Sequence, residues 1–190
     1  MPQTAEKIIF DDLRFTYEDY LQLPDDGKRY EIIEGELVMS PAPKLSHQAL
    51  LRNLVKYLLS FIEENKSGTL FFAPCDVVFS DLSIVQPDIL FISNENRSIM
   101  KESNIQGTPD LIIEVTSPST EDRDLGYKKR LYAKYGVREY WIVDPNREKI
   151  EVWNWESNRY VLSGFYEKSE SAKSLLLSGF EVELEKVFRI

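Results

Sequence analysis

The chain has 190 residues, of which 43% are hydrophobic and 29% are charged. This is the composition of a globular protein with a substantial core, and it excludes a wholly disordered chain. No apolar run is long enough to cross a membrane, and the N-terminal residues lack the layout of a secretory signal. A single cysteine, Cys75, and a single histidine, His47, exclude an internal disulfide and a structural zinc site. We therefore expect a cytoplasmic protein that forms one domain over residues 1–190.

The net charge is −9, from 23 basic and 32 acidic residues. A negative mean field repels phosphate polymers, so nonspecific coating of nucleic acid is disfavoured. A local basic groove is still compatible with this balance, and an excess of carboxylates is also what a divalent-cation site requires. Charge alone leaves both functions open.

The first third of the chain predicts a short helix, a hairpin and a long helix. A capping-box pattern at Thr16 opens the short helix. Two strand-like runs, 29–33 and 36–40, are joined as in a β-hairpin. Ser46 is placed to cap the long helix. The apolar residues of this helix fall at helical spacing, at Leu51, Leu54, Val55, Leu58 and Ile62.

The rest of the chain alternates strands with one further helix. The predicted strands are 70–80, 84–93, 111–117 and 139–144, followed by a hairpin of 149–155 and 159–165. The helix lies between the third and fourth strands, over 120–135, and ends at Gly136. A strand–helix–strand crossover implies a mixed α/β fold in which helices pack on a mixed sheet.

Asp88 and Glu114 are carboxylates inside predicted strands whose neighbours are apolar. A buried ionised group is costly unless it is paired or binds a metal. If the two strands are adjacent, the carboxylates can lie about 4.8 Å apart and share one divalent ion. Oxygen ligands without a cysteine or histidine cluster favour Mg²⁺ or Mn²⁺ over zinc. Asp110, four residues before Glu114, would be about 13 Å away from it, so we interpret Asp110 as a strand-entry residue.

Lys128 lies close to the stripe of its helix that should face the sheet. Its ammonium could reach the two carboxylates and stabilise charge that develops on a transition state during phosphoryl transfer. A lysine that snorkels to solvent, or one that pairs with Asp124, explains the same position. From the residues alone, the structural explanation is the commoner one.

Among four other polar residues, His47 has both a functional and a structural interpretation, and the other three have one expected placement each. His47 falls on the apolar side of its helix, where it could orient a phosphate or an attacking water, or serve as a hydrogen-bonded structural histidine. Gln86 is expected to line the active cleft. Glu34, in a turn, is expected to be solvated, and Asp76 is expected to be exposed on the outer face of its strand.

Several motifs are spread along the chain. They are Tyr30 to Leu37, Ser46-His47-Gln48, Gln86-Pro87-Asp88-Ile89, Pro109 to Thr120, Asp124 to Lys128, Tyr132 to Val137 and Glu139 to Pro145. Together they resemble a bacterial family labelled putative restriction endonucleases, the Uma-type family of the PD-(D/E)XK nuclease superfamily. The similarity covers most of the chain.

This resemblance implies a restriction-endonuclease-like core, with a central mixed β-sheet flanked by helices and added β-hairpins. It also implies Mg²⁺-dependent hydrolysis of DNA phosphodiester bonds. Asp88 matches the superfamily's aspartate and Glu114 matches its acidic residue. Both are expected to hold the metal, with a backbone carbonyl near Val115 as a further ligand.

The chain departs from the superfamily pattern at Thr116, where a lysine is usual. A lysine two residues after the acid would lie on the same face of the strand, about 6.6 Å along it. Lys128 is the expected substitute, entering the same space from the following helix to assist the attacking water. His47 or Gln86 would orient that water.

Two other functions stay open. The charge of −9 and the missing lysine favour a catalytically inactive restriction-endonuclease-like protein that acts in binding or assembly. A nuclease that acts on RNA or on branched or single-stranded DNA would need the same ligands. Cutting both strands of a duplex is simplest with a two-fold pair of chains, and a homodimer is expected on that ground only.

Overall fold

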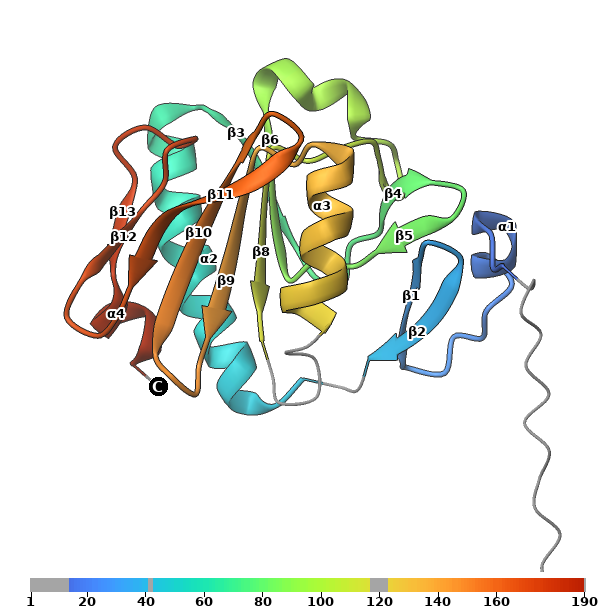
Figure 1. Ribbon diagram of the computed structural model, residues 1–190, viewed down its shortest axis with the longest axis horizontal. Coiled ribbons are helices and arrows are strands. Elements are labelled where there is room, and N and C mark those ends of the chain that lie inside the picture. The colour runs from blue at the N-terminus through green and yellow to red at the C-terminus, as the bar shows by residue number, and fades with distance from the viewer. Residues whose placement is uncertain (1–13, 41–42, 117–122, 190) are drawn as a thin grey trace, which may run out of the picture.

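The computed structural model describes residues 14–40, 43–116 and 123–189. Two larger β-sheets and a small two-stranded sheet are packed with helices (Figure 1). The helical segments are α1 (Tyr17–Tyr20), α2 (Leu45–Asn65), the 3₁₀ segment η1 (Asn94–Ile99), the π-helical segment η2 (Arg123–Lys128), α3 (Lys129–Tyr135) and α4 (Leu184–Phe188). No helix in these described ranges has the length and apolar character that crossing a membrane requires.

The largest sheet has six strands in the order β11-β10-β9-β8-β6-β3. The strands are β3 (Gly68–Phe72), β6 (Ile89–Ser93), β8 (Leu111–Val115), β9 (Glu139–Asp144), β10 (Lys149–Glu156) and β11 (Arg159–Tyr166). β8 and β9 are parallel, whereas the other neighbouring strands are antiparallel. The parallel pair follows from the helical crossover of η2 and α3, which lie between β8 and β9 in the chain. The predicted mixed α/β fold and the hairpin of β10 and β11 are confirmed.

A second sheet has five strands in the order β2-β1-β5-β4-β7. The strands are β1 (Arg29–Ile33), β2 (Glu36–Ser40), β4 (Val77–Ser80), β5 (Ser83–Val85) and β7 (Ile105–Gln106). β1 and β2 pair in antiparallel register from Arg29↔Ser40 to Ile33↔Glu36, which confirms the predicted hairpin. The small sheet pairs β12 (Ser171–Lys173) with β13 (Glu181–Glu183).

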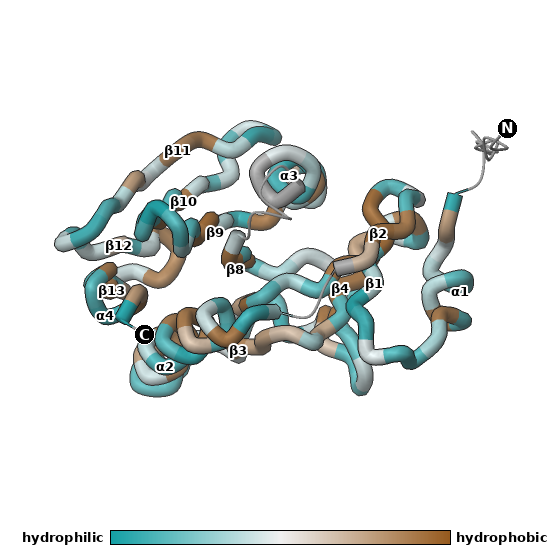
Figure 2. Tube along the Cα trace, turned by 90° about the horizontal axis from the view of Figure 1, so that it is seen from below, coloured by the Kyte–Doolittle hydropathy of each residue, from teal (hydrophilic) through white to brown (hydrophobic). Residues whose placement is uncertain are grey.

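Side chains of the six-stranded sheet alternate between two hydrophobic clusters, one on each face. On β8, Leu111, Ile113 and Val115 belong to the cluster beneath α2, whereas Ile112 belongs to the cluster beneath α3. Figure 2 shows α2 and α3 on opposite sides of β8 and β9. Because strand residues alternate between faces, Glu114 shares the α3 face with Ile112. Glu114 therefore lies on the side of the sheet that the helical crossover of η2 and α3, with Lys128, covers.

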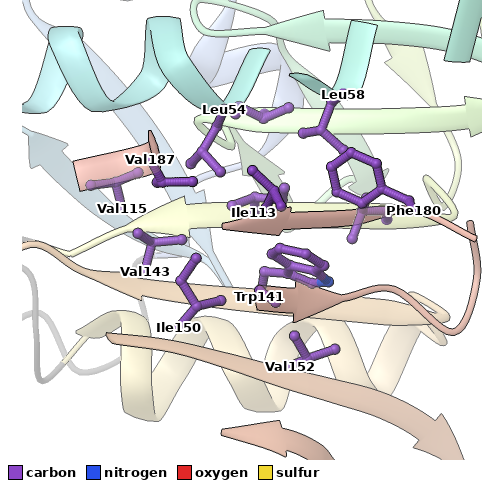
Figure 3. Close-up of a cluster of buried hydrophobic side chains, with 14 of the residues drawn as sticks. Leu54, Leu58, Ile113, Val115, Trp141, Val143, Ile150, Val152, Phe180 and Val187 are labelled. Carbon is purple, nitrogen blue, oxygen red and sulfur yellow. The ribbon is translucent and has the colours of Figure 1, made fainter. Parts of the chain in front are cut away.

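Helix α2 buries most of the apolar stripe that its sequence predicts. Leu51, Leu54, Leu58 and Ile62 are buried, and Leu50 joins them in the core. Figure 3 shows this helix above the sheet, with its leucines pointing at the strands. Each fully buried leucine or isoleucine contributes about 2 kcal/mol through the hydrophobic effect. The stripe fixes the orientation of the helix and therefore the direction in which its other faces point.

The start of α2 differs from the prediction. The helix begins at Leu45, and Lys44 is its N-cap residue, with an extended backbone and no side-chain capping bond. The carbonyl of Lys44 accepts the first helical hydrogen bond, from the N–H of Gln48. The prediction that Ser46 caps the helix is therefore wrong, because Ser46 already lies inside the first turn.

Two predicted strands are each divided by a proline. Residues 70–80 form β3 and β4 in different sheets, and Pro74 lies between them. Residues 84–93 form β5 and β6, also in different sheets, and Pro87 lies between them. Proline has no N–H to donate to a strand ladder, so the chain can leave one sheet and enter the other at these points. Asp88 consequently lies just before β6 rather than inside a strand.

Two predicted helix boundaries are confirmed, the start of α1 and the end of α3. Thr16 forms a capping box with Asp19 at the start of α1. Gly136 ends α3 in the left-handed conformation, with a φ of 76°. The first residues of the helix predicted over 120–135 lie outside the described residues, and from Arg123 to Lys128 the helix is π rather than α.

Candidate active site

Strand pairing brings Asp88 and Glu114 opposite one another. β6 and β8 are adjacent and antiparallel, with Ile89 paired to Ile113. One further step of this register places position 88 opposite position 114. Both residues are buried, with exposed fractions of 6% for Asp88 and 4% for Glu114. The predicted adjacency of the two strands is confirmed, and the carboxylates reach this place from different strand ends.

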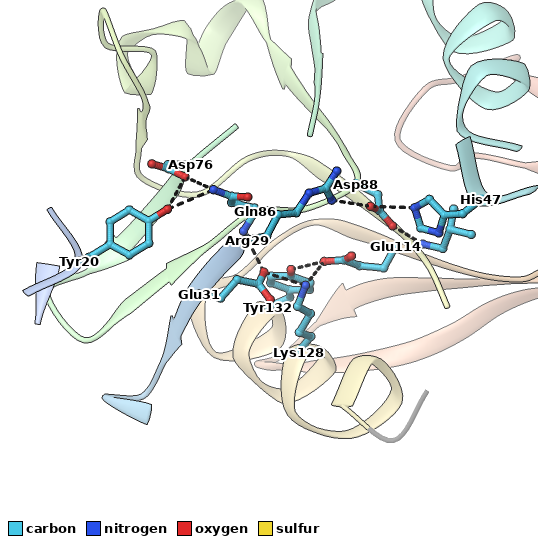
Figure 4. Close-up of polar contacts among 11 residues, drawn as sticks. Tyr20, Arg29, Glu31, His47, Asp76, Gln86, Asp88, Glu114, Lys128 and Tyr132 are labelled. Atoms are coloured by element: carbon cyan, nitrogen blue, oxygen red, sulfur yellow. Dashed lines mark hydrogen bonds and ion pairs between the residues drawn. The ribbon is translucent and has the colours of Figure 1, made fainter. Parts of the chain in front are cut away.

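Asp88 is held by a backbone donor and by two nitrogen-bearing side chains (Figure 4). The N–H of Val115 donates to its Oδ2 at 2.9 Å. His47 Nε2 lies 3.2 Å from its Oδ1, and an Arg29 guanidinium nitrogen lies 3.8 Å from the same oxygen. These contacts offset the cost of burying the carboxylate and fix its direction. His47 thus reaches Asp88 from the first turn of α2, a contact that is compatible with both of its interpretations.

Glu114 contacts two side chains of the helical crossover. Lys128 Nζ donates to its Oε1 at 2.9 Å, and the Tyr132 hydroxyl donates to the same oxygen at 2.6 Å. Burial raises the pKa of Tyr132 well above its ordinary value, and the nearby carboxylate of Glu114 adds to this effect. Tyr132 therefore remains a protonated donor throughout the physiological pH range.

Lys128 is an internal ammonium, with only 3% of the residue exposed. Its Nζ lies 2.9 Å from Glu114 Oε1 and 2.9 Å from Glu31 Oε1. The interpretation of Lys128 as a lysine that snorkels to solvent is therefore wrong. Thr116, which occupies the position where the superfamily has lysine, turns its hydroxyl to the carbonyl of Val143 at 3.3 Å. Among the residues that the structure describes, the ammonium beside Glu114 comes from Lys128 of the helical crossover.

Glu31 is a residue of the site that the sequence analysis missed. It lies on β1 with an exposed fraction of 2%, and its Oε1 also accepts the N–H of Gln86 at 2.9 Å. Its Oε2 is buried and has no hydrogen-bond partner among the described residues. A period-two pattern was available as a signal, because Glu31 lies two residues before the buried Ile33 and so shares its face. Tyr132 was also missed, although it follows Lys128 by one helical turn.

Gln86 does not point to the paired carboxylates. Its side-chain amide donates to Asp76 Oδ1 at 2.8 Å and lies 3.1 Å from the hydroxyl of Tyr20. Tyr20 also donates to Asp76 Oδ1 at 2.8 Å. The predicted exposure of Asp76 is wrong, because α1 and Gln86 cover it. Gln86 contributes to the site with its backbone N–H, which donates to Glu31 Oε1.

Two further acids lie away from these contacts. Asp110 precedes β8, as predicted, and its carboxylate accepts the N–H of Ser93 at 2.8 Å. Glu34, in the turn between β1 and β2, forms an exposed ion pair with Lys134, and both side chains are 57% exposed. The predicted solvation of Glu34 is confirmed. Neither acid is part of the cluster around Lys128.

The donor set fits a divalent cation that prefers oxygen. Asp88, just before β6, lies opposite Glu114 in the strand register, and Glu31, whose Oε2 is buried without a hydrogen-bond partner among the described residues, shares Lys128 with Glu114. Within the described ranges, no group of three or more His, Cys, Asp or Glu side chains is arranged to hold a metal ion. An ion bound to Asp88 and Glu114 would therefore complete its shell with backbone oxygen, water or a substrate phosphate, as Mg²⁺ commonly does.

Comparisons with known proteins identify the fold and the family of the chain. A crystal structure of a "putative nuclease belonging to DUF820" from Anabaena variabilis matches with a TM-score of 0.76 and 20% sequence identity, covering 92% of this chain and 98% of that one. This likeness shows a shared fold, and the expected restriction-endonuclease-like core is confirmed. No curated protein matches the chain. A family model described as "Uma2: Putative restriction endonuclease" matches residues 17–185. Because the match spans most of the sequence, the protein belongs to the Uma2 family.

Proposed function

We propose that the protein is a nuclease that hydrolyses DNA phosphodiester bonds with Mg²⁺ or Mn²⁺. The observation that carries this proposal is the position of Lys128 Nζ, 2.9 Å from Oε1 of Glu114, the residue that lies opposite Asp88 in the strand register. Two carboxylates and an ammonium are the groups that a metal-dependent phosphodiesterase needs. Membership of a family described as restriction endonucleases, and the fold shared with a structure titled as a nuclease, support the same reaction class.

The residues have distinct roles in this proposal. Asp88 and Glu114 would hold the ion, and the carbonyl of Val115 would be a further ligand. A divalent ion at this place supplies Lewis-acid polarisation of the scissile phosphate. The N–H of Val115 and His47 keep the Asp88 carboxylate directed at the site.

Lys128 and His47 act on the substrate side. The Lys128 ammonium donates to the attacking water or to a non-bridging phosphate oxygen, and its charge offsets the negative charge that develops in the transition state. His47 lies on the other side of Asp88 and orients the water or the phosphate. Gln86 contributes through its backbone N–H, which donates to Glu31, so its side chain is not part of the proposal.

DNA is proposed as the substrate on the basis of the family description, and cleavage of both strands would be simplest for a homodimer. Two alternatives are kept because specific features favour them. The net charge of −9 and the threonine at position 116 favour an inactive protein that acts in binding or assembly. The ligand set is equally suited to RNA or to structured DNA, because the phosphodiester is common to all of them.

A substrate panel tests the proposal. Labelled duplex DNA, single-stranded DNA, branched DNA and RNA would be incubated with Mg²⁺, Mn²⁺, Ca²⁺ or EDTA. We expect cleavage of DNA in Mg²⁺ or Mn²⁺ and none in EDTA. Glu114→Gln should reduce the rate about 1000-fold because it removes charge at the reacting centre. The matched control is Glu34→Gln, which makes the same change at an exposed residue outside the site and should cleave at the wild-type rate.

The outcomes separate the three functions. Cleavage of RNA or branched DNA alone would move the proposal to that substrate. No cleavage of any substrate in Mn²⁺ would contradict every enzymatic function and support the binding protein. Equal activity of Glu114→Gln and the wild type would show that cleavage came from elsewhere in the chain or from a contaminant.

A further inference from the structure

We infer that Glu31 is the positioning residue of Lys128 and keeps its ammonium in the site when Glu114 binds a divalent ion. This inference rests on the proposed function, because it concerns the same lysine. It assigns a role to a residue of the five-stranded sheet, whereas Asp88 and Glu114 belong to the six-stranded sheet. The active site then requires both sheets.

The Lys128 ammonium needs a binding partner that holds it in place, because its side chain comes from the helical crossover and not from strand β8. A lysine two residues after the acid would be directed into the site by the strand itself. In this chain that position is Thr116, whose hydroxyl contacts the carbonyl of Val143. The ammonium instead enters at the end of a flexible four-carbon side chain from η2. Its position depends on the groups that bind the ammonium at its tip.

Glu114 alone cannot supply that anchor during catalysis. Its Oε1 now accepts hydrogen bonds from Lys128 and Tyr132. A divalent cation on the Glu114 carboxylate would repel the neighbouring ammonium, because like charges a few ångströms apart in a poorly solvated site interact strongly. A second, permanent acceptor on the other side of the ammonium is therefore required.

Glu31 has the geometry of such an acceptor. Its Oε1 lies 2.9 Å from Lys128 Nζ, and the same oxygen is fixed by the N–H of Gln86 at 2.9 Å. Gln86 lies in the segment between β5 and β6 that also delivers Asp88 to the site. One crossing between the sheets thus positions both the ligand Asp88 and the anchor Glu31 (Figure 4).

The second carboxylate oxygen of Glu31 is a further acceptor for the Lys128 ammonium. Glu31 Oε2 is buried and has no hydrogen-bond partner within the described part of the chain. A lysine ammonium has three N–H donors. When one of them loses its contact with Glu114, Glu31 Oε2 is available to accept it. The unpartnered oxygen is then a reserve acceptor, present before the ion binds and used after it.

The test compares Glu31→Gln with Glu34→Gln. Both substitutions remove one negative charge from the same β-hairpin and from a carboxylate that pairs with a lysine of the crossover, but only Glu31 is buried in the site. For Glu31→Gln we expect kcat on DNA to fall about 100-fold, the cost of a misplaced reacting group. KM for DNA should stay at its wild-type value, and the dissociation constant for Mn²⁺ should rise by less than about tenfold, because an ammonium held by Glu114 alone competes with the ion. Glu34→Gln should match the wild type in all three.

A second measurement does not depend on cleavage. Lysines would be pulse-labelled with acetic anhydride with and without Mn²⁺, and labelling of Lys128 would be quantified by mass spectrometry. Lys128 should stay protected in the wild type under both conditions. In Glu31→Gln it should become labelled when Mn²⁺ is added, because neither acid then retains the ammonium.

The possible results are distinct. Wild-type cleavage and continued protection of Lys128 in Glu31→Gln would overturn the inference. A loss of Mn²⁺ affinity as large as the loss of kcat would also overturn it and make Glu31 a metal ligand. If the wild type binds Mn²⁺ but cleaves no substrate, the proposed function fails. The labelling experiment alone then decides the role of Glu31. Absence of Mn²⁺ binding to the wild type would overturn both.

Discussion

Replacing Lys128 by methionine is expected to reduce DNA cleavage about 1000-fold while strengthening the binding of Mn²⁺. Methionine keeps the volume of the side chain but removes the ammonium that lies 2.9 Å from both Glu31 and Glu114. The reaction loses the charge that offsets its transition state. The divalent ion, in turn, no longer shares Glu114 with a competing cation.

The same variant should be unstable in EDTA. Removing the ammonium leaves two buried carboxylates without that compensating charge, which typically costs about 3–5 kcal/mol of the free energy of unfolding. Mn²⁺ should restore most of this loss, because ligand binding to the folded state stabilises it. The double variant Lys128→Met with Glu31→Gln carries one buried charge fewer, and it should be more stable than the single variant in EDTA but equally inactive.

Urea unfolding with and without Mn²⁺, together with a cleavage assay, measures these effects. Lys134→Met is the matched control, because the Lys134 side chain is 57% exposed and forms its ion pair with a surface acid of the hairpin turn, Glu34. It should change neither stability nor cleavage appreciably. Wild-type cleavage by Lys128→Met would contradict any role of the lysine in the reaction.

Replacing Glu139 by glutamine is expected to lower the free energy of unfolding by about 2–4 kcal/mol. Glu139 is fully buried at the start of β9. Its carboxylate accepts hydrogen bonds from the side chains of Trp141, Asn154 and Ser174 and from the backbone N–H groups of Leu175 and Leu176. Glutamine has the same shape, but its NH₂ group would face donors, so some of these bonds must break.

The effect should be greatest in the C-terminal segment. Glu139 ties residues 174–176 to the sheet, and the segment that follows contributes Leu177, Phe180, Val182 and Leu184 to the core beneath α2. Hydrogen exchange in Glu139→Gln should therefore increase most over residues 171–188. Glu156→Gln, an exposed change on the neighbouring strand, should shift stability by less than about 0.5 kcal/mol. A loss below about 1 kcal/mol in Glu139→Gln would contradict this account.

The two acids could be predicted from the sequence because both adjoin apolar strand residues, Glu114 inside β8 and Asp88 directly before β6. Glu114 lies within five consecutive buried residues of β8, and an acid in such a run needs a partner. Lys128 could be predicted because it lies on the buried side of a helix that must cover the sheet. These features depend on local periodicity, which the sequence carries directly.

The remaining features depend on how separate segments meet. The prolines at positions 74 and 87 indicate where a strand ladder must stop, but only the tertiary structure shows that the chain changes sheets there. Glu31 reaches Lys128 from the other sheet, and Asp76 is covered by Tyr20 and Gln86. Periodicity can mark a residue such as Glu31 as buried, but it does not show which residue far along the chain it will contact.

The central claim is that Asp88 and Glu114 together bind one divalent ion beside Lys128. Anomalous diffraction from crystals of the wild type and of Asp88→Asn, both soaked in Mn²⁺, tests it most directly. We expect one manganese peak in contact with both carboxylates, with Lys128 Nζ adjacent, and no peak at that place in Asp88→Asn. A well-ordered site without manganese in the wild type, or manganese bound elsewhere in both crystals, would contradict the account.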